Sequence, residues 1–202
     1  MFVQVIQGPV SDAGQARAQM DRWMSDLAPS AEGWLGSTGG VTDDGTLVAV
    51  VRFESEEAAM RNSDRPEQGE WWKGMEALFT GEPEFRNSSE VDVDTPGDPS
   101  TAGFVQVMQG KSSDPARVRE LMAQDPTDWA NFRPDILGSV SATHEGGDWT
   151  MAIYFTSEAD AREGEKKEPP PEMQAIMQEM DSLSIGEQRF YDIRDPWLDA
   201  PA

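Results

Sequence analysis

The chain has 202 residues and no cysteine, and its 38 Asp and Glu residues outnumber its 16 Lys and Arg residues, for a formal net charge of −22. Such an acidic surface repels phosphate backbones and anionic lipid, no apolar run is long enough to span a bilayer, and the absence of cysteine excludes disulfide and thiolate chemistry. The N-terminus lacks the pattern of a secretory signal, so we expect a cytoplasmic protein with neither nucleic-acid nor membrane partners.

One stretch of sequence occurs twice. Residues 2–12 read FVQVIQGPVSD and residues 104–114 read FVQVMQGKSSD, identical at eight of eleven positions. A repeat of about 100 residues is too long for a solenoid unit and has the size of a small domain. We therefore expect two copies of one fold, at residues 1–93 and 103–195, with a polar linker at 94–102 and a tail at 196–202.

The first copy predicts the element order β-α-β-β-α-β. Its first strand is apolar on both faces, which indicates a sheet covered on both sides. Asp43-Asp44-Gly45 has the chemistry of a hairpin turn, and Pro66 interrupts the second helical region. The expected strands are residues 2–7, 34–42, 46–53 and 84–93, and the expected helical regions are 13–27 and 55–79.

The second copy follows the same order. Leu137-Gly138-Ser139 repeats Leu35-Gly36-Ser37, and Gly146-Gly147 replaces the first hairpin turn. A βαββαβ unit of this length is ferredoxin-like, so the predicted fold class is α+β with two ferredoxin-like repeats. The residues from Asp195 onward are expected to pack loosely.

A short motif follows the hairpin in both copies, as Phe53-Glu-Ser-Glu-Glu-Ala58 and as Phe155-Thr-Ser-Glu-Ala159. With the element order, it resembles the antibiotic biosynthesis monooxygenase (ABM) group of the dimeric α/β-barrel superfamily. The resemblance implies that both halves of a barrel come from one chain, as a pseudo-dimer. It implies either a cofactor-independent monooxygenase acting on a small aromatic or apolar molecule, or a non-catalytic small-molecule-binding or stress-related barrel. Whether the protein is an enzyme therefore stays open, and no cofactor is expected.

The haem-degrading branch of that group suggests which positions to compare. Its members carry an amide near the end of the first strand, where this chain has Gln7 and Gln109. A tryptophan and a histidine follow on their second helix, but Asn62 and Gly164 stand near the tryptophan position, and neither second helix contains a histidine. Haem degradation of that type and a metal site are therefore not expected.

Polar residues within the predicted strands are candidates for ligand binding. Gln4 and Gln7, repeated as Gln106 and Gln109, need hydrogen-bond partners if they are buried. They either form hydrogen-bonded pairs across the barrel or at a strand end, or orient a ligand carbonyl or hydroxyl. Arg52 and its counterpart Tyr154 alternate with the apolar core face of their strands. They either bind an anionic or phenolic ligand between the sheets, connect the two halves, or reach solvent at the rim.

The last candidates are a lone histidine and a group of tryptophans. His144, at the end of a predicted hairpin strand, is either a surface residue or a general base or metal ligand. Tryptophans on the helices of the first copy have non-aromatic counterparts in the second. They either pack in the core or line a flat apolar cleft, and the asymmetry is expected if one copy keeps a pocket and the other is filled. These tryptophans are Trp23, Trp71 and Trp72.

Overall fold

The computed structural model describes residues 1–201, which divide into two compact units. Unit 1 comprises Met1–Val91 and the residues from Asp192 onward, and unit 2 comprises Asp92–Tyr191. Each unit is α+β with a ferredoxin-like order of elements, as predicted, and its sheet has five strands where four were predicted. The units differ from the predicted copies at their ends, because the chain contributes its last strand to the sheet of unit 1.

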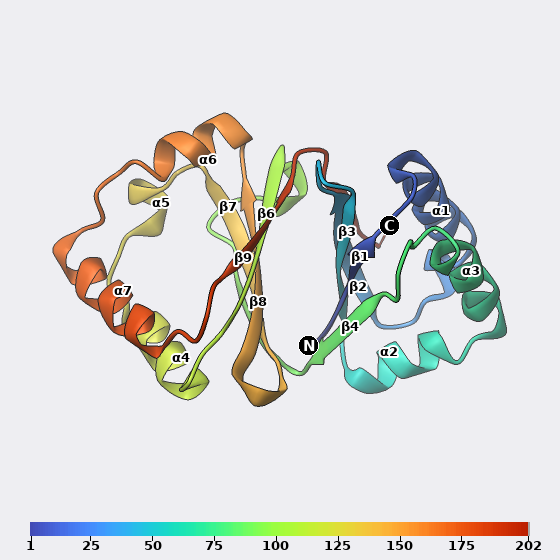
Figure 1. Ribbon diagram of the computed structural model, residues 1–202, viewed down its shortest axis with the longest axis horizontal. Helices are drawn as coiled ribbons and strands as arrows, with labels where there is room; N and C mark the ends of the chain where they lie inside the picture. The colour runs from blue at the N-terminus through green and yellow to red at the C-terminus, as the bar shows by residue number, and fades with distance from the viewer. Residues whose placement is uncertain (202) are drawn as a thin grey trace. The chain divides into compact units, whose positions relative to one another are not determined.

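The sheet of unit 1 has the strand order β10-β2-β3-β1-β4, and all its neighbouring strands are antiparallel. Its helices lie together on one face of this sheet (Figure 1). The strands are β1 (Phe2–Pro9), β2 (Trp34–Val41), β3 (Thr46–Phe53), β4 (Glu84–Ser88) and β10 (Trp197–Asp199). The helices are α1 (Ala13–Asp26), η1 (Ala28–Ser30), α2 (Glu56–Ser63) and α3 (Pro66–Glu76).

Side-chain capping defines where the helices of unit 1 begin. The Asp12 carboxylate accepts a hydrogen bond from the Gln15 backbone N–H at 2.9 Å, and the Ser55 hydroxyl accepts one from Ala58 at 3.2 Å. Such caps satisfy backbone donors that have no partner within the helix. Pro66 begins α3, where its missing N–H costs nothing and its fixed φ angle suits the first turn.

Both faces of this sheet are buried, as the apolar pattern of the first strand predicts. On β3, Leu47 and Phe53 point to the helices, whereas Val48 and Val50 alternate with them and lie on the other face. All four are almost completely excluded from solvent. The faces are therefore distinct environments, and the helix-side face carries the cavity described below.

The C-terminal tail is paired with the sheet of unit 1, so the prediction that it packs loosely is wrong. Residues 197–199 form β10, an edge strand paired with β2, and Trp197 is only 8% exposed. The Ile193 side chain packs over Gly40, and Arg194 forms an ion pair with Asp43 of the β2–β3 turn. A short polar tail with one tryptophan gives no local sign of this pairing, since its partner strand lies far away in sequence.

Unit 2 repeats the architecture with the strand order β5-β7-β8-β6-β9. Figure 1 again shows its helices on one face of the sheet. The predicted strand at 84–93 is two strands, because β4 ends at Ser88 in unit 1 and β5 joins the sheet of unit 2. The strands are β5 (Glu90–Asp94), β6 (Phe104–Lys111), β7 (Ile136–Thr143), β8 (Asp148–Phe155) and β9 (Arg189–Ile193). The helices are η2 (Pro99–Thr101), α4 (Pro115–Gln124), α5 (Trp129–Phe132), η3 (Glu145–Gly147), α6 (Glu158–Gly164) and α7 (Pro171–Leu183).

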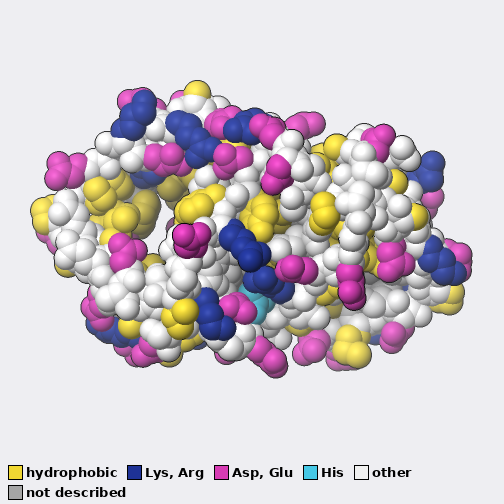
Figure 2. Space-filling view, viewed as in Figure 1, with side chains coloured by type: hydrophobic (Ala, Val, Ile, Leu, Met, Phe, Trp, Pro, Cys, Tyr) yellow, Lys and Arg dark blue, Asp and Glu magenta, His cyan; other side chains and the backbone are white. Residues whose placement is uncertain are grey.

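The surface agrees with the acidic composition. Figure 2 shows Asp and Glu side chains scattered over the whole visible face, with fewer Lys and Arg side chains among them. Within residues 1–201, no helix has the length and apolar character needed to cross a membrane.

Candidate functional site

A cavity of about 270 Å³ lies in unit 1, between the helix-side face of the sheet and the helices that cover it. Drug-sized ligands occupy pockets of about 300–1,000 Å³, so this cavity suits a small molecule of two or three fused rings. Its lining is mostly apolar and comes from the strands of the sheet and from all three α-helices. The residues used below are Gln4, Trp23, Trp34, Ser37, Asn62, Gln68, Gly69, Trp71, Trp72, Phe85, Trp197 and Asp199.

A continuous series of aromatic rings, here called the aromatic wall, forms one side of the cavity. Its members are Trp34, Trp23, Trp71, Trp72 and Phe85. The centroids of Trp34 and Trp23 are 4.8 Å apart in an edge-to-face arrangement, and those of Trp72 and Phe85 are 5.4 Å apart. Trp71 joins the two ends, with centroids 6.5 Å from Trp23 and 6.2 Å from Trp72. Such a wall offers flat, polarisable contact area to an aromatic ligand.

Two of these indoles are held in place by hydrogen bonds between helices. Trp23 on α1 donates from Nε1 to Gln68 Oε1 on α3 at 2.7 Å. Trp71 on α3 donates from Nε1 to the Gln19 carbonyl at 2.7 Å, and Gln19 Nε2 donates back to the Trp71 carbonyl at 2.9 Å. Buried indole N–H groups need such partners, so these contacts fix the rings before any ligand arrives.

Two further donors line the cavity without a partner. The Trp34 indole Nε1 and the Ser37 hydroxyl are buried and make no hydrogen bond with residues 1–201. An unpaired buried donor costs about 1–3 kcal/mol relative to a paired one. Asn62 adds an amide nitrogen, since its Oδ1 already accepts from Arg65 Nη1 at 3.0 Å. A ligand oxygen in the cavity would satisfy these donors.

Strand register places three polar side chains in one row across the cavity floor. Asp199 on β10 pairs with Ser37 on β2, and both Ser37 and Gln4 pair with Val51 on β3. Directly paired residues point to the same face of a sheet. The polar row Asp199–Ser37–Gln4, with Val51 between Ser37 and Gln4, therefore crosses an otherwise apolar floor and favours a defined orientation of a bound molecule.

Asp199 is the charged member of that row. Its side chain is only 10% exposed, and its nearest cation is Arg17, with Nη1 3.6 Å from Oδ2. Burial raises the pKa of the Asp199 carboxyl, and Arg17 only partly opposes the shift.

The cavity brings together five of the residues selected from the sequence: Gln4, Trp23, Asn62, Trp71 and Trp72. Gln7 and Arg52 do not line it. Gln7 Nε2 donates to Glu84 Oε2 at 3.1 Å, and Arg52 alternates with the cavity-lining residues of β3 and lies against Gly36.

The remaining candidates belong to unit 2. His144 Nε2 lies 3.0 Å from Thr150 Oγ1, and Thr150 pairs with Gln109 across β8 and β6. Thr150, Gln109 and Tyr154 are all buried. Thr150 and Tyr154 alternate with Phe155, which belongs to a separate apolar cluster with Phe104 and Ala161. His144, Gln109 and Tyr154 therefore contribute nothing to the cavity of unit 1.

Three residues that line the cavity are not predicted from the sequence: Trp34, Ser37 and Asp199. Trp34 and Ser37 lie in a predicted strand, and a strand aromatic or a strand serine is by itself ordinary. One signal was available for Trp34, since its counterpart in the second copy is Ile136 and it shares the asymmetry of the other tryptophans. Asp199 carries no such signal, because only the pairing of β10 brings it to the cavity.

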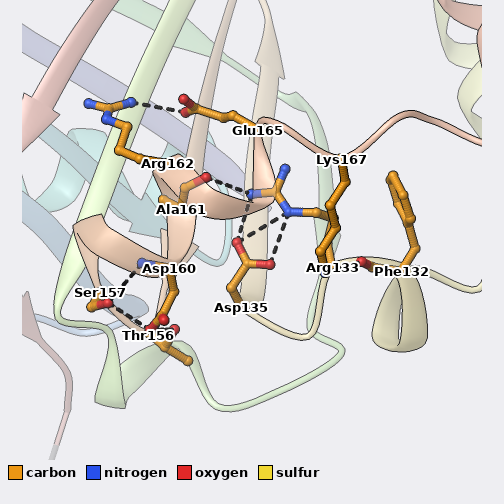
Figure 3. A network of polar contacts seen from close by, with 10 residues as sticks. All are labelled: Phe132, Arg133, Asp135, Thr156, Ser157, Asp160, Ala161, Arg162, Glu165 and Lys167. Atoms are coloured by element: carbon orange, nitrogen blue, oxygen red, sulfur yellow. Dashed lines mark hydrogen bonds and ion pairs between the residues drawn. The ribbon is translucent and has the colours of Figure 1, made fainter.

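The corresponding part of unit 2 holds an ion pair, drawn in Figure 3. Arg133 Nη2 lies 2.7 Å from Asp135 Oδ2 and also reaches the Ala161 carbonyl at 3.4 Å. Its guanidinium stands over the Phe155 ring, 5.7 Å from the centroid, and a Cβ at Gly164 would overlap it. Beside it, hydrogen bonds from the Ser157 and Thr156 hydroxyls lower the pKa of Asp160. Arg133 thus fills space beside the counterparts of the cavity residues Phe53 and Asn62.

Comparison with known proteins bears on the fold. No protein-family model matches the sequence, and no curated protein is significantly similar to it. A "putative monooxygenase" from Lactobacillus acidophilus NCFM has a TM-score of 0.73 at 12% identity, with 98% of each chain covered. Another, from Fusobacterium nucleatum subsp. nucleatum ATCC 25586, has a TM-score of 0.75 at 9% identity, covering 98% of this chain and 94% of that one. An "anthrone oxidase-like protein" has a TM-score of 0.63 at 10% identity, covering 98% and 92%. The chain thus has the fold of these proteins over nearly its whole length.

Proposed function

We propose that unit 1 binds a small, flat aromatic molecule in the tryptophan-lined cavity and inserts one oxygen atom from O₂ into it without a cofactor. The observation that carries this proposal is the pairing of an aromatic wall with unpaired buried donors. Trp34 Nε1 and Ser37 Oγ have no partner in the described chain, whereas the indoles of Trp23 and Trp71 are paired. A carbonyl or phenolic oxygen on an aromatic ligand satisfies donors of this kind.

The shape of the cavity favours a ring system over a flexible chain. The aromatic wall contacts the face or edge of a ring, and its rings are fixed by packing and hydrogen bonds before binding. Preformed walls avoid the cost of ordering side chains on association. The polar row then restricts how the ring system can be turned.

The oxygenation part of the proposal rests on the fold. ABM-like monooxygenases, which this chain resembles, take the electrons for O₂ reduction from the substrate. For an anthrone, the overall change converts a ring CH₂ group and O₂ into a ring carbonyl and water, which balances atoms and electrons. The protein then has to bind and orient the aromatic, exclude bulk water and accept a proton.

The test is a titration of the protein with anthrone, followed by the quenching of tryptophan fluorescence under anaerobic conditions. We expect saturable quenching, and we expect Ser37→Ala to weaken the affinity about five- to tenfold because one hydrogen bond to the ring carbonyl is lost. Ser139→Ala changes the corresponding serine of unit 2 and should leave the affinity unchanged. Ser37→Ala should not lower the free energy of unfolding, since it removes an unpaired buried hydroxyl.

Oxygenation is measured separately with an oxygen electrode after air is admitted. We expect one O₂ consumed per anthrone and one anthraquinone formed, faster than in buffer alone. Saturable binding with no acceleration would instead establish the non-catalytic binding protein. Absence of saturable quenching would refute the site for this ligand class.

A further inference from the structure

Asp199 is the only side chain lining the cavity of unit 1 that belongs to the acidic or basic residue types. The other lining groups are apolar side chains, indoles, amides and hydroxyls. The single histidine lies in unit 2, beside Thr150. Within residues 1–201, a reaction in this cavity that moves a proton therefore has one side chain able to accept it.

The position of Asp199 is set by backbone pairing. β10 pairs with β2 in the register Trp197↔Gly39, Leu198↔Thr38 and Asp199↔Ser37. Trp197 and Asp199 consequently point to the cavity, together with Gly39 and Ser37, and Leu198 points away. A carboxylate on a paired strand is held more firmly than one on a loop.

The charge of Asp199 is incompletely neutralised. Arg17 makes its shorter contact elsewhere, with Nη2 2.8 Å from Asp21 Oδ1, while its Nη1 stays 3.6 Å from Asp199 Oδ2. The Arg17 guanidinium also stands over the Trp197 ring, 5.5 Å from the centroid. Burial raises the pKa of Asp199 and Asp21 adds to the rise, so the carboxylate is a stronger base than an exposed aspartate.

We propose that the Asp199 carboxylate is the proton acceptor of this cavity, taking a hydrogen bond from an acidic O–H or C–H group of the bound aromatic and, during oxygenation, its proton. The second half of this statement rests on the function proposed above. The first half concerns binding alone and stands independently of it.

For a substrate with a ring CH₂ group, Asp199 accepts and returns protons in the following order. Asp199 removes one proton, and the carbanion combines with O₂ to form a carbon–oxygen bond and a peroxide anion. Asp199 returns its proton to that anion and then removes the second C–H proton as the O–O bond breaks. The departing hydroxide takes this proton and leaves as water, so the carboxylate is regenerated and the product is the ketone.

The catalytic half is tested with Asp199→Asn, which keeps the size of the side chain and removes the base. We expect the anthrone oxygenation rate to fall about a hundredfold or more, the typical contribution of a positioned general base. Asp199→Glu should restore part of the rate. Asp195→Asn, an exposed change in the same segment, should leave it unchanged. An Asp199→Asn protein that oxidises anthrone at the wild-type rate would overturn this half.

The binding half is tested by comparing 2-naphthol with 2-methoxynaphthalene, which lacks the O–H donor. We expect the wild type to prefer 2-naphthol about tenfold, as a hydrogen bond to a charged acceptor allows, and Asp199→Asn to lose most of that preference. An undiminished preference in Asp199→Asn would overturn the proposal. If the wild type proves inert toward anthrone, the oxygenase function fails, but this ratio still decides whether Asp199 accepts a proton donor.

The pH dependence of the oxygenation rate provides a further check. The oxygenation rate should fall as the pH drops through the raised pKa of Asp199, at higher pH than an ordinary aspartate would produce. The other charged groups that act on this carboxyl are Arg17 and Asp21 on α1. Asp21→Asn should therefore move the profile to lower pH, and a profile insensitive to both Asp199 and Asp21 would contradict the assignment.

Discussion

Units 1 and 2 have a nearly identical first strand and the same order of elements, yet their interiors differ. In unit 1, tryptophans on α1, β2 and α3 surround a cavity that retains unpaired donors. In unit 2, the corresponding end holds the Arg133–Asp135 ion pair (Figure 3). A duplicated fold has thus kept its backbone while its two interiors have acquired different chemistry.

The second helical regions show the same contrast. In α3 of unit 1, Met75 is buried and packs in a cluster with Trp71 and Trp72 around it. In α7 of unit 2, no residue is buried, and Met177 is 42% exposed. Figure 2 shows the corresponding side of the view, where Figure 1 draws α4 to α7, hollowed and lined by hydrophobic side chains. Trp71 and Trp72 therefore pack α3 against the sheet of unit 1, whereas Met173 and Gln174 at the corresponding positions leave α7 less closely packed.

The edge strands of the two sheets also differ. Unit 1 receives β10, which adds Trp197 and Asp199 to its cavity. Unit 2 receives β5, in which Asp94 takes the place of Asp199: a Cβ at Gly138 would meet the Asp94 carbonyl at 2.9 Å, as a Cβ at the equivalent Gly36 would meet the Asp199 carbonyl at 2.8 Å. Residues equivalent to the polar row therefore occur in unit 2 as Asp94, Ser139 and Gln106, but Asp94 is exposed, whereas the Asp199 side chain is only 10% exposed.

The largest expected effect tests how far unit 1 depends on its edge strand. Trp197→Ala should lower the free energy of unfolding by about 4 kcal/mol, the usual cost of truncating a buried tryptophan. Anthrone binding should be lost, because the same ring lines the cavity. Denaturant titration and anaerobic fluorescence quenching measure the two effects. Trp129→Ala on the short helix α5 is the control, and equal losses in both variants would contradict a special role for β10.

Arg133→Ala tests whether unit 2 is filled by its ion pair. The change strips Asp135 of its partner, and both side chains are nearly buried, so we expect a loss of about 3 kcal/mol in unfolding free energy. The double variant Arg133→Leu/Asp135→Leu should recover most of it, since no uncompensated charge remains. Neither variant should change anthrone affinity in unit 1. A single variant as stable as the wild type would show that the pair contributes little.

Much of the contrast between the units is readable in the sequence. The repeated stretch predicts two copies, and the apolar periodicities of 2 and 3.6 residues predict the order of strands and helices. Trp23, Trp71 and Trp72 correspond to non-aromatic residues in the second copy. These signals are local, or compare two positions at a fixed offset. They predict the ferredoxin-like fold and the wall of the cavity from which the site is built.

The remainder depends on contacts between distant parts of the chain. Asp199 reaches Ser37 only through the pairing of β10 with β2, and a three-residue strand has no periodicity to detect. Ser37 is a candidate donor to a ligand because its buried hydroxyl lacks a hydrogen-bond partner, and that lack depends on the side chains packed around it in the fold. His144 was selected for its residue type and Arg52 for its alternation with the apolar face of its strand, and neither residue lines the cavity.

Trp72→Ala separates a binding surface from core packing within the aromatic wall. Trp72 is only half-buried and contacts Phe79 and Phe85 at centroid distances of 6.2 and 5.4 Å. We expect anthrone affinity to fall about tenfold and the unfolding free energy to fall by less than about 1.5 kcal/mol, the scale of an aromatic pair. Gln174→Ala, at the corresponding position of unit 2, should leave binding unchanged. A large loss of stability without a change in affinity would mark Trp72 as a core residue.

The smallest expected effect follows from adding a methyl group at Gly69 in unit 1, compared with adding one at Gly164 in unit 2. A Cβ at Gly69, in α3, would meet no atom within 4 Å, and Gly69 lines the cavity. Gly69→Ala should therefore raise the unfolding free energy by about 0.5–1 kcal/mol through helix propensity, while narrowing the cavity and weakening three-ring anthrone more than two-ring 2-naphthol. Gly164→Ala in unit 2 should instead destabilise by about 1–3 kcal/mol, because its Cβ would overlap Arg133. Opposite signs would mean that the cavity edge at Gly69 has room for a methyl group, whereas the space beside Gly164 is filled by Arg133. A stabilising Gly164→Ala would show that Arg133 can move aside.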